Sequence, residues 1–230
     1  MRFSRILTTV AAGILAAGFS FNAAFAAPIV SASIVANGTP APFALEDFGS
    51  GGPAGLISGA DFTTSTGVEV SFTGLSGIYS GDVGGQTRSP FRDAGGAATD
   101  ERYLNARVGG TVVLEFSSFQ TAFNLLWGSV DKSPDDYNLL TFTFSGLAGS
   151  ETVTGAQAFA AAGGGVISGT TNLAVWISNL NPFDTLTITA SREAFEFAPG
   201  VPVPEPGSLA LLGLGLAGLA AASRRKQKQA

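Results

Sequence analysis

Hydrophobic and polar residues alternate with a period of two along much of the central chain. In residues 68–73, for example, Val68, Val70 and Phe72 alternate with polar side chains. Successive side chains of a strand point to opposite faces, so this period indicates strands with one buried face. The same pattern, bounded by Gly, Asn, Asp and Pro turn clusters, predicts further strands over 29–36, 112–116, 121–130, 140–145, 150–156, 173–179, 185–189 and 192–198.

Helical periodicity is nearly absent between the two ends of the chain. Ala156–Ala162 could form one turn or a short helix, and no internal repeat is visible. Two antiparallel sheets that face each other would bury one face of every predicted strand. We therefore predict an all-β body over residues 27–199, an antiparallel β-sandwich that is jelly-roll-like.

The N-terminus has the organisation of a signal peptide. Two arginines precede an apolar stretch over 6–21, and Ala24 and Ala26 supply small residues at the spacing that signal peptidase accepts. We predict a signal peptide over 1–26 and a mature chain that begins at Ala27, with an uncleaved anchor as the alternative. The chain has no cysteine, which fits either redox compartment, so the signal peptide decides for export.

A second apolar segment lies near the C-terminus. Residues 207–223 carry no charge and predict a single transmembrane helix, although the sixteen residues Gly207–Ala222 would span only about 24 Å as a helix, short of a hydrocarbon core about 30 Å thick. The basic residues directly after it, Arg224, Arg225 and Lys226, are typical of a stop-transfer signal. The orientation predicted is therefore body outside, with the tip 224–230 in the cytoplasm.

Prolines dominate the linker between the body and this helix. In residues 200–206, Pro204 and Pro206 flank Glu205, and proline disfavours helix in the residue before it. We expect an extended, exposed backbone that a processing enzyme at the membrane could read.

The order Pro-Glu-Pro, apolar helix and Arg-rich end resembles the PEP-CTERM sorting signal read by exosortase, a membrane-embedded cysteine protease-like enzyme. The resemblance covers about residues 202–226 and implies that exosortase recognises Glu205 and cuts in or near the motif. It also implies a Gram-negative source, in which the body is held briefly at the inner membrane and then reaches the cell surface or extracellular matrix. The alternative is a plain tail anchor that follows a chance proline linker.

A second resemblance lies in the body. The runs "YLNARVGGTVVLEF", "FNLLWGSVDKSPDDYNLLTF" and "DTLTITASREAFEFAPGVPVPEP" are similar to exosortase-dependent surface proteins of the Npun_F0296 type. This resemblance spans about residues 100–206. It implies an extracellular β-rich surface protein and carries over no catalytic residue.

The charge of the exported part limits its partners. Residues 27–206 hold six basic residues and all seventeen acids, a net charge of −11. Nucleic acids and anionic lipid headgroups bind basic patches, so neither is an expected partner of the body. Cations, neutral sugars and other proteins remain.

The residue types present also limit the chemistry. The chain has no His and no Cys, which removes Ser-His-Asp and Cys-His catalysis and the usual zinc ligands. Asp131, Asp135 and Asp136 in "SVDKSPDDYN" could bind Ca²⁺, with a solvated turn as the alternative. Glu46 and Asp47 form a weaker acidic pair. We expect no other cofactor.

Aromatic side chains are the candidates for sugar binding. Trp176 has the strand parity opposite to Leu173, Val175 and Ile177, so it faces outward if those three face the core. The other candidates are Trp127, Tyr79, Tyr103 and Tyr137.

The sequence therefore predicts an exported, non-enzymatic surface or matrix protein that is processed by signal peptidase and exosortase. The alternative is an extracellular carbohydrate-binding module that acts on exopolysaccharide. A glycosidase needs two carboxylates across a cleft, and seventeen acids make such a pair too unspecific to predict.

Overall fold

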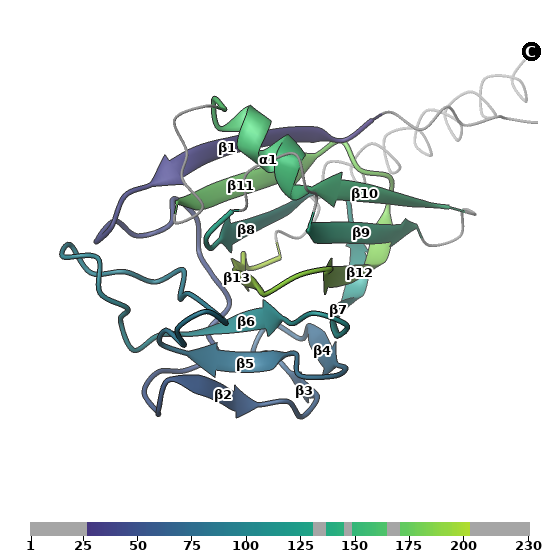
Figure 1. Cartoon of the computed structure of the whole chain (residues 1–230). Coiled ribbons are helices and arrows are strands. Elements are labelled where there is room, and N and C mark those ends of the chain that lie inside the picture. Colours follow the sequence, from purple (N-terminus) through teal and green to yellow (C-terminus); the bar gives the residue numbers. More distant parts are fainter. Residues whose placement is uncertain (1–26, 131–136, 145–148, 165–170, 203–230) are drawn as a thin grey trace, which may run out of the picture.

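The computed structural model describes residues 27–130, 137–144, 149–164 and 171–202, and these residues form two antiparallel sheets (Figure 1). The seven-stranded sheet contains, in spatial order, β1 (Ile29–Val35), β11 (Asn172–Ser178), β8 (Phe123–Trp127), β13 (Phe195–Pro199), β6 (Arg102–Ala106), β5 (Gly77–Ser80) and β2 (Gly55–Ser58). The six-stranded sheet contains β10 (Ser150–Thr154), β9 (Asn138–Phe144), β12 (Phe183–Ala190), β7 (Thr111–Gln120), β4 (Glu69–Phe72) and β3 (Phe62–Thr63). The all-β, antiparallel fold class is confirmed.

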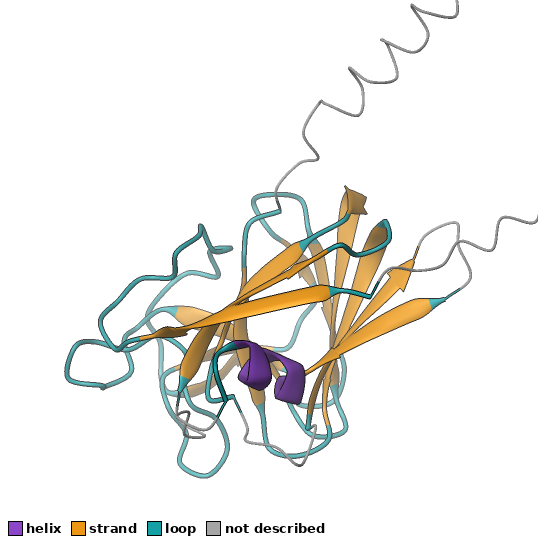
Figure 2. Ribbon diagram, turned by 90° about the horizontal axis from the view of Figure 1, so that it is seen from above, coloured by secondary structure: helices purple, strands orange, loops and turns teal. Residues whose placement is uncertain are grey.

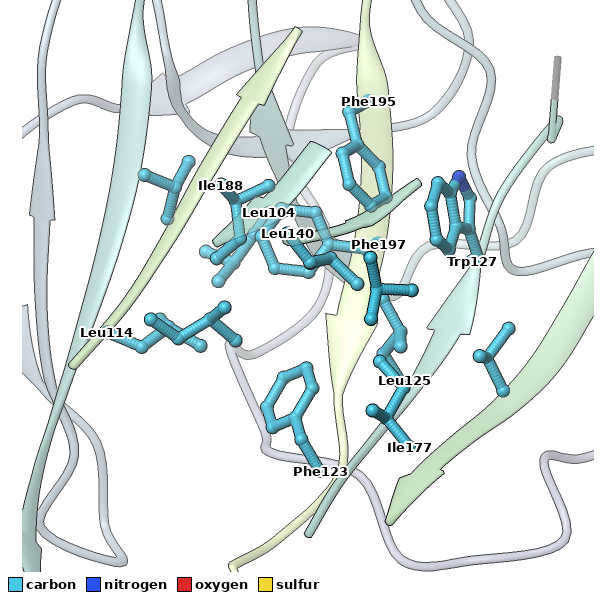
Figure 3. Close-up of a cluster of buried hydrophobic side chains, with 14 of the residues drawn as sticks. Leu104, Leu114, Phe123, Leu125, Trp127, Leu140, Ile177, Ile188, Phe195 and Phe197 are labelled. Atoms are coloured by element: carbon cyan, nitrogen blue, oxygen red, sulfur yellow. The ribbon is translucent and has the colours of Figure 1, made fainter. Parts of the chain in front are cut away.

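The inner faces of the two sheets share one hydrophobic core (Figure 3). Phe123 of β8 meets Phe142 of β9 across the sandwich, with ring centroids 6.0 Å apart. In the seven-stranded sheet, Trp127 stacks on Phe195 of β13 at 4.2 Å. Apolar surface removed from water stabilises a fold by roughly 25 cal/mol per Å², so this aromatic core is the main source of stability.

One short helix closes a side of the sandwich (Figure 2). The helix α1 (Gly155–Ala161) contacts β1, an edge of one sheet, and β10, an edge of the other. It begins with a capping box in which the Thr154 hydroxyl accepts from the Gln157 N–H and the Gln157 side chain accepts from the Thr154 N–H. The short helix predicted over Ala156–Ala162 is confirmed within one residue.

The outer faces of the two sheets differ. Threonines such as Thr143, Thr185 and Thr187 give the six-stranded sheet a polar outer face that is exposed or half-buried. The outer face of the seven-stranded sheet is instead covered in part by the loops 36–54 and 81–101, so that outward-pointing residues of β6 and β13 are fully buried. A second, more polar core results, and the candidate site lies within it.

The last strand of the body is the middle strand of its sheet. β13 lies between β8 and β6, and its pairing continues beyond Pro199. The Gly200 N–H donates to the Asn124 carbonyl at 2.8 Å, and the Val201 N–H donates to the Ala44 carbonyl at 3.0 Å. Regular hydrogen bonding therefore extends to within one residue of Pro202, where the described chain ends.

The first described residue lies at the same end of the sandwich as the last. The Asn179 side chain donates to the Ala27 carbonyl at 3.1 Å, and Ile29 pairs with Ser178. Ser178 in turn lines one cavity together with residues 200–202. The predicted signal peptide 1–26 and transmembrane helix 207–223 lie outside the described residues. Among the residues that the structure describes, no helix is long and apolar enough to cross a bilayer.

Candidate functional site

A buried carboxyl group forms the floor of a polar cavity on the outer face of the seven-stranded sheet. Glu196 points away from the core because it alternates with Phe195 and Phe197, yet it is only 3% exposed. Its Oε1 accepts from the Arg88 N–H at 2.8 Å, and its Oε2 accepts from the Ser129 hydroxyl at 3.0 Å. The loop that carries Arg88 therefore covers β13 and holds the carboxyl in place.

Burial changes the protonation of this carboxyl. Desolvation raises the pKa of Glu196 to about 7, although hydrogen bonds from Arg88, Ser129 and Thr87 act in the opposite direction. The group is thus partly protonated near neutral pH, so it can both donate and accept hydrogen bonds.

The walls of the cavity are held by two ion pairs. Arg92 binds Asp82 through two bonds of 2.7 Å, and Arg107 binds Glu193 at 3.0 Å. The cavity between these walls has a volume of about 460 Å³ and is lined by residues 82–88, Ser129, Glu193, Ala194 and Glu196. Because each rim carboxylate has an arginine partner, the lining carries little unbalanced charge.

Backbone strain is concentrated at the same cavity. Among the described residues other than glycine, Ser129, Ala194 and Asn179 have a positive φ. Ser129 (φ 38°) and Ala194 (φ 42°) both line the cavity. Such conformations cost on the order of 1–3 kcal/mol and are typical of positions that are held for a function.

Asn105 lies beside Glu196 on the neighbouring strand. The two residues are paired across β6 and β13, so their side chains share the outer face. Asn105 is fully buried, and neither its amide oxygen nor its amide nitrogen has a hydrogen-bond partner among the described residues. Buried amides are nearly always hydrogen-bonded, so the Asn105 side chain next to Glu196 is an unusual amide whose donor and acceptor groups the surrounding protein does not satisfy.

Two tyrosines complete the buried polar layer. The Tyr103 hydroxyl donates to the Gly81 carbonyl at 2.8 Å and contacts the Thr87 hydroxyl at 2.8 Å. Burial raises the pKa of Tyr103 above its ordinary value, so its phenol stays neutral. Tyr79 is paired with it and donates to the Leu75 carbonyl.

The groups of this site are suited to a neutral, hydroxyl-rich ligand. Its lining offers the Glu196 carboxyl and the hydroxyls of Ser129 and Thr87, which can exchange hydrogen bonds with uncharged polar molecules. No cluster of three potential metal-ligating side chains occurs in the part of the chain that the structure describes. The sequence analysis missed Glu196, because a single glutamate between two phenylalanines is the ordinary pattern of a solvent-facing strand position.

The structure separates the aromatic candidates. Trp176 faces outward, as its parity predicted; it packs edge-on against Phe43 at 5.4 Å and lines a cavity of about 310 Å³. The prediction of exposed sugar-binding side chains is wrong for Trp127, Tyr79 and Tyr103, because all three are buried. Tyr137 lies under the Arg192 guanidinium, 4.4 Å from its ring centre.

The acidic candidates are only partly placed. Glu46 is buried and accepts from the Thr66 hydroxyl, whereas Asp47 is exposed and accepts from the Gly49 N–H. These two carboxyls therefore have different surroundings. Asp131, Asp135 and Asp136 lie outside the described residues, so calcium binding there stays a prediction. The described residues also exclude the signal cleavage residues Ala24 and Ala26, the motif Pro204–Pro206 and the basic residues 224–226. Ala27 is described and exposed.

The fold and the cavity define an antiparallel β-sandwich body with a polar site beneath its loops. The model of the PEP-CTERM protein-sorting motif matches residues 202–226, which confirms the resemblance of the C-terminal segment. This motif indicates exosortase-dependent sorting of an exported protein that passes through the membrane of a Gram-negative bacterium. No curated protein and no solved structure matches the chain, and the Npun_F0296-type resemblance is not confirmed.

Proposed function

We propose that the protein is a non-enzymatic component of the cell surface or extracellular matrix, which exosortase releases or transfers by cutting at or near Pro204–Pro206. The observation that carries this proposal is the sorting motif at 202–226, which begins at the last described residue of the sandwich. A chain without His or Cys also lacks the usual nucleophile and base pairs, which favours a structural role over catalysis.

The test changes the acid of the motif. Glu205→Ala removes the carboxylate between the two prolines, so the chain should stay membrane-associated and unprocessed in a host that carries exosortase. The measurement is membrane fractionation with intact mass of both fractions. Glu115→Ala, which removes an exposed glutamate of the body, is the matched control and should be released as the wild type is. Normal release of Glu205→Ala would contradict the sorting role of this residue.

Carbohydrate binding is a second candidate function, and the polar cavity above Glu196 favours it. We expect neutral oligosaccharides, prepared from the exopolysaccharide of the source bacterium, to bind with a heat that titration calorimetry can measure. Ser129→Ala removes one donor to the carboxyl and should weaken this binding. Ser178→Ala, outside the cavity, is the control. Equal affinity in both variants would place any sugar site elsewhere.

A further inference from the structure

The end of the sandwich from which the sorting motif leaves is unlike the rest of the acidic body. This end, here called the exit end, is formed by residues 27–31, 116–124, 176–183 and 199–202. None of these segments contains an acidic or basic residue. Asp184 and the exposed Glu115 lie at its border, and Glu46, whose N–H donates to the Pro199 carbonyl, is buried, whereas the adjacent Asp47 is exposed.

The exit end also presents apolar side chains to the solvent. Ile29 at the start of β1 is 59% exposed, and Phe119 near the end of β7 is 54% exposed. Half-buried Trp176 and the segment Val201–Pro202 line a cavity at the same end. Large apolar side chains grouped on an otherwise polar protein mark interaction surfaces, and tryptophan is enriched where proteins meet membrane headgroups.

The short separation along the chain between the body and the predicted transmembrane helix limits what this surface can meet. The Val201 N–H is still bonded to Ala44, and the sorting motif begins at residue 202. Only the short segment 202–206 therefore separates the last backbone hydrogen bond of the body from the transmembrane helix predicted to begin at residue 207. A body tethered so closely must turn its exit end toward the bilayer, because a free chain of n residues spans at most about 3.6 Å × n.

Charge complementarity points to the same partner. A body with a net charge of −11 is repelled by anionic headgroups, whereas a charge-free apolar end is compatible with a zwitterionic surface. We propose that the exit end is a membrane-contact surface, which lies on the zwitterionic lipid of the outer leaflet while the chain awaits processing. This inference rests on the membrane passage in the proposed function.

The experiment uses the full chain in phosphatidylcholine vesicles. Because the chain has no cysteine, a single introduced thiol can carry an environment-sensitive fluorophore. The test positions are Phe119→Cys and Ile29→Cys. The matched control is Leu75→Cys, which is 65% exposed and lies beyond the opposite end of the ten-residue β7. The labels at 119 and 29 should shift to the blue and show several-fold weaker quenching by iodide than the label at 75.

Each other outcome overturns the inference. Equal iodide quenching at the three positions would mean a tethered body that does not touch the lipid. Protection that grows with the protein-to-lipid ratio would identify a second copy as the partner, and protection that needs added exosortase would identify the enzyme. A chain that does not float with the vesicles would overturn the membrane anchor as well, whereas a floating chain without protection would overturn the contact surface alone.

Discussion

At the scale of single residues, Glu196 is a polar group in a position that costs stability. The protein buries its carboxyl under the 81–101 loop and compensates it with the Arg88 N–H and the Ser129 hydroxyl. Desolvation still dominates, because the pKa stands at about 7 instead of its usual value near 4.5. The folded protein therefore binds a proton at Glu196 more tightly than the unfolded chain does.

This difference predicts the direction of a pH effect. An acid with a raised pKa in the folded state favours folding at low pH, so its contribution falls as the pH rises from about 4.5 to about 7 and is constant above. The change should be on the order of 3 kcal/mol in the free energy of unfolding. Urea denaturation of residues 27–202 at pH 5 and pH 8 measures it.

The control for this effect is Glu196→Gln. Its amide oxygen can still accept from the Arg88 N–H and its amide nitrogen can donate to the Ser129 hydroxyl, so the geometry is kept while the titration is lost. From pH 5 to pH 8, the free energy of unfolding of the wild type should therefore fall relative to that of Glu196→Gln. Any advantage of the wild type at pH 5 should be smaller or reversed at pH 8. A constant difference would show that Glu196 does not titrate in this range.

At the scale of elements, α1 joins the edges of the two sheets, and its first turn depends on one side chain. Thr154→Ala removes the hydroxyl that accepts from the Gln157 N–H, which should lower the free energy of unfolding by about 1 kcal/mol. Thr154→Ser keeps the acceptor and is the matched control. Urea unfolding curves compare the two variants. An equal loss in both would assign the effect to the lost methyl group rather than to the cap.

Strands with a visible period of two were predictable from the sequence, including β13, which is buried on both faces, and strands without such a period were not. All nine predicted strands are present, with ends that differ by a few residues. The short β2 and β3 offer too few positions for a period to be visible. In β5 and β6 the alternation is missing because loops cover the outer face, so that Tyr103 and Asn105 are as buried as Leu104.

The same cause hid the candidate site. The strand that contains Glu196 was predicted over 192–198, and the parity of Phe195 and Phe197 correctly placed the carboxyl on the outer face. Whether an outer face is wet depends on loops that pack onto it from distant parts of the chain. Arg88 is 108 positions away from Glu196 along the chain, and no local pattern signals that contact.

At the scale of the whole molecule, the order of the strands links folding to sorting. β13 is the last strand in sequence but the central one of its sheet, where it contributes the fully buried Phe195 and Phe197. The seven-stranded sheet cannot be completed until this strand has been exported. The sorting motif follows this strand directly, at residue 202, so the residues that complete the sheet and those that direct sorting are adjacent in the chain.

This order predicts where the chain can be cut without loss of the fold. A chain that ends at Pro202 keeps every hydrogen bond of β13 and should melt cooperatively. One that ends at Ala194 loses the central strand and two core aromatics, so it should show no cooperative transition. Ending at Pro199 removes only the bonds of Gly200 and Val201 to Asn124 and Ala44, each worth about 1 kcal/mol, and should lower the melting temperature by a few degrees.

Circular dichroism melting measures the stability of all three truncated chains. The intact mass of the body released in the host should then show a C-terminus at or beyond Val201. A cooperative melt of the chain that ends at Ala194, or a released body that stops short of Pro199, would contradict this link between the last strand and processing.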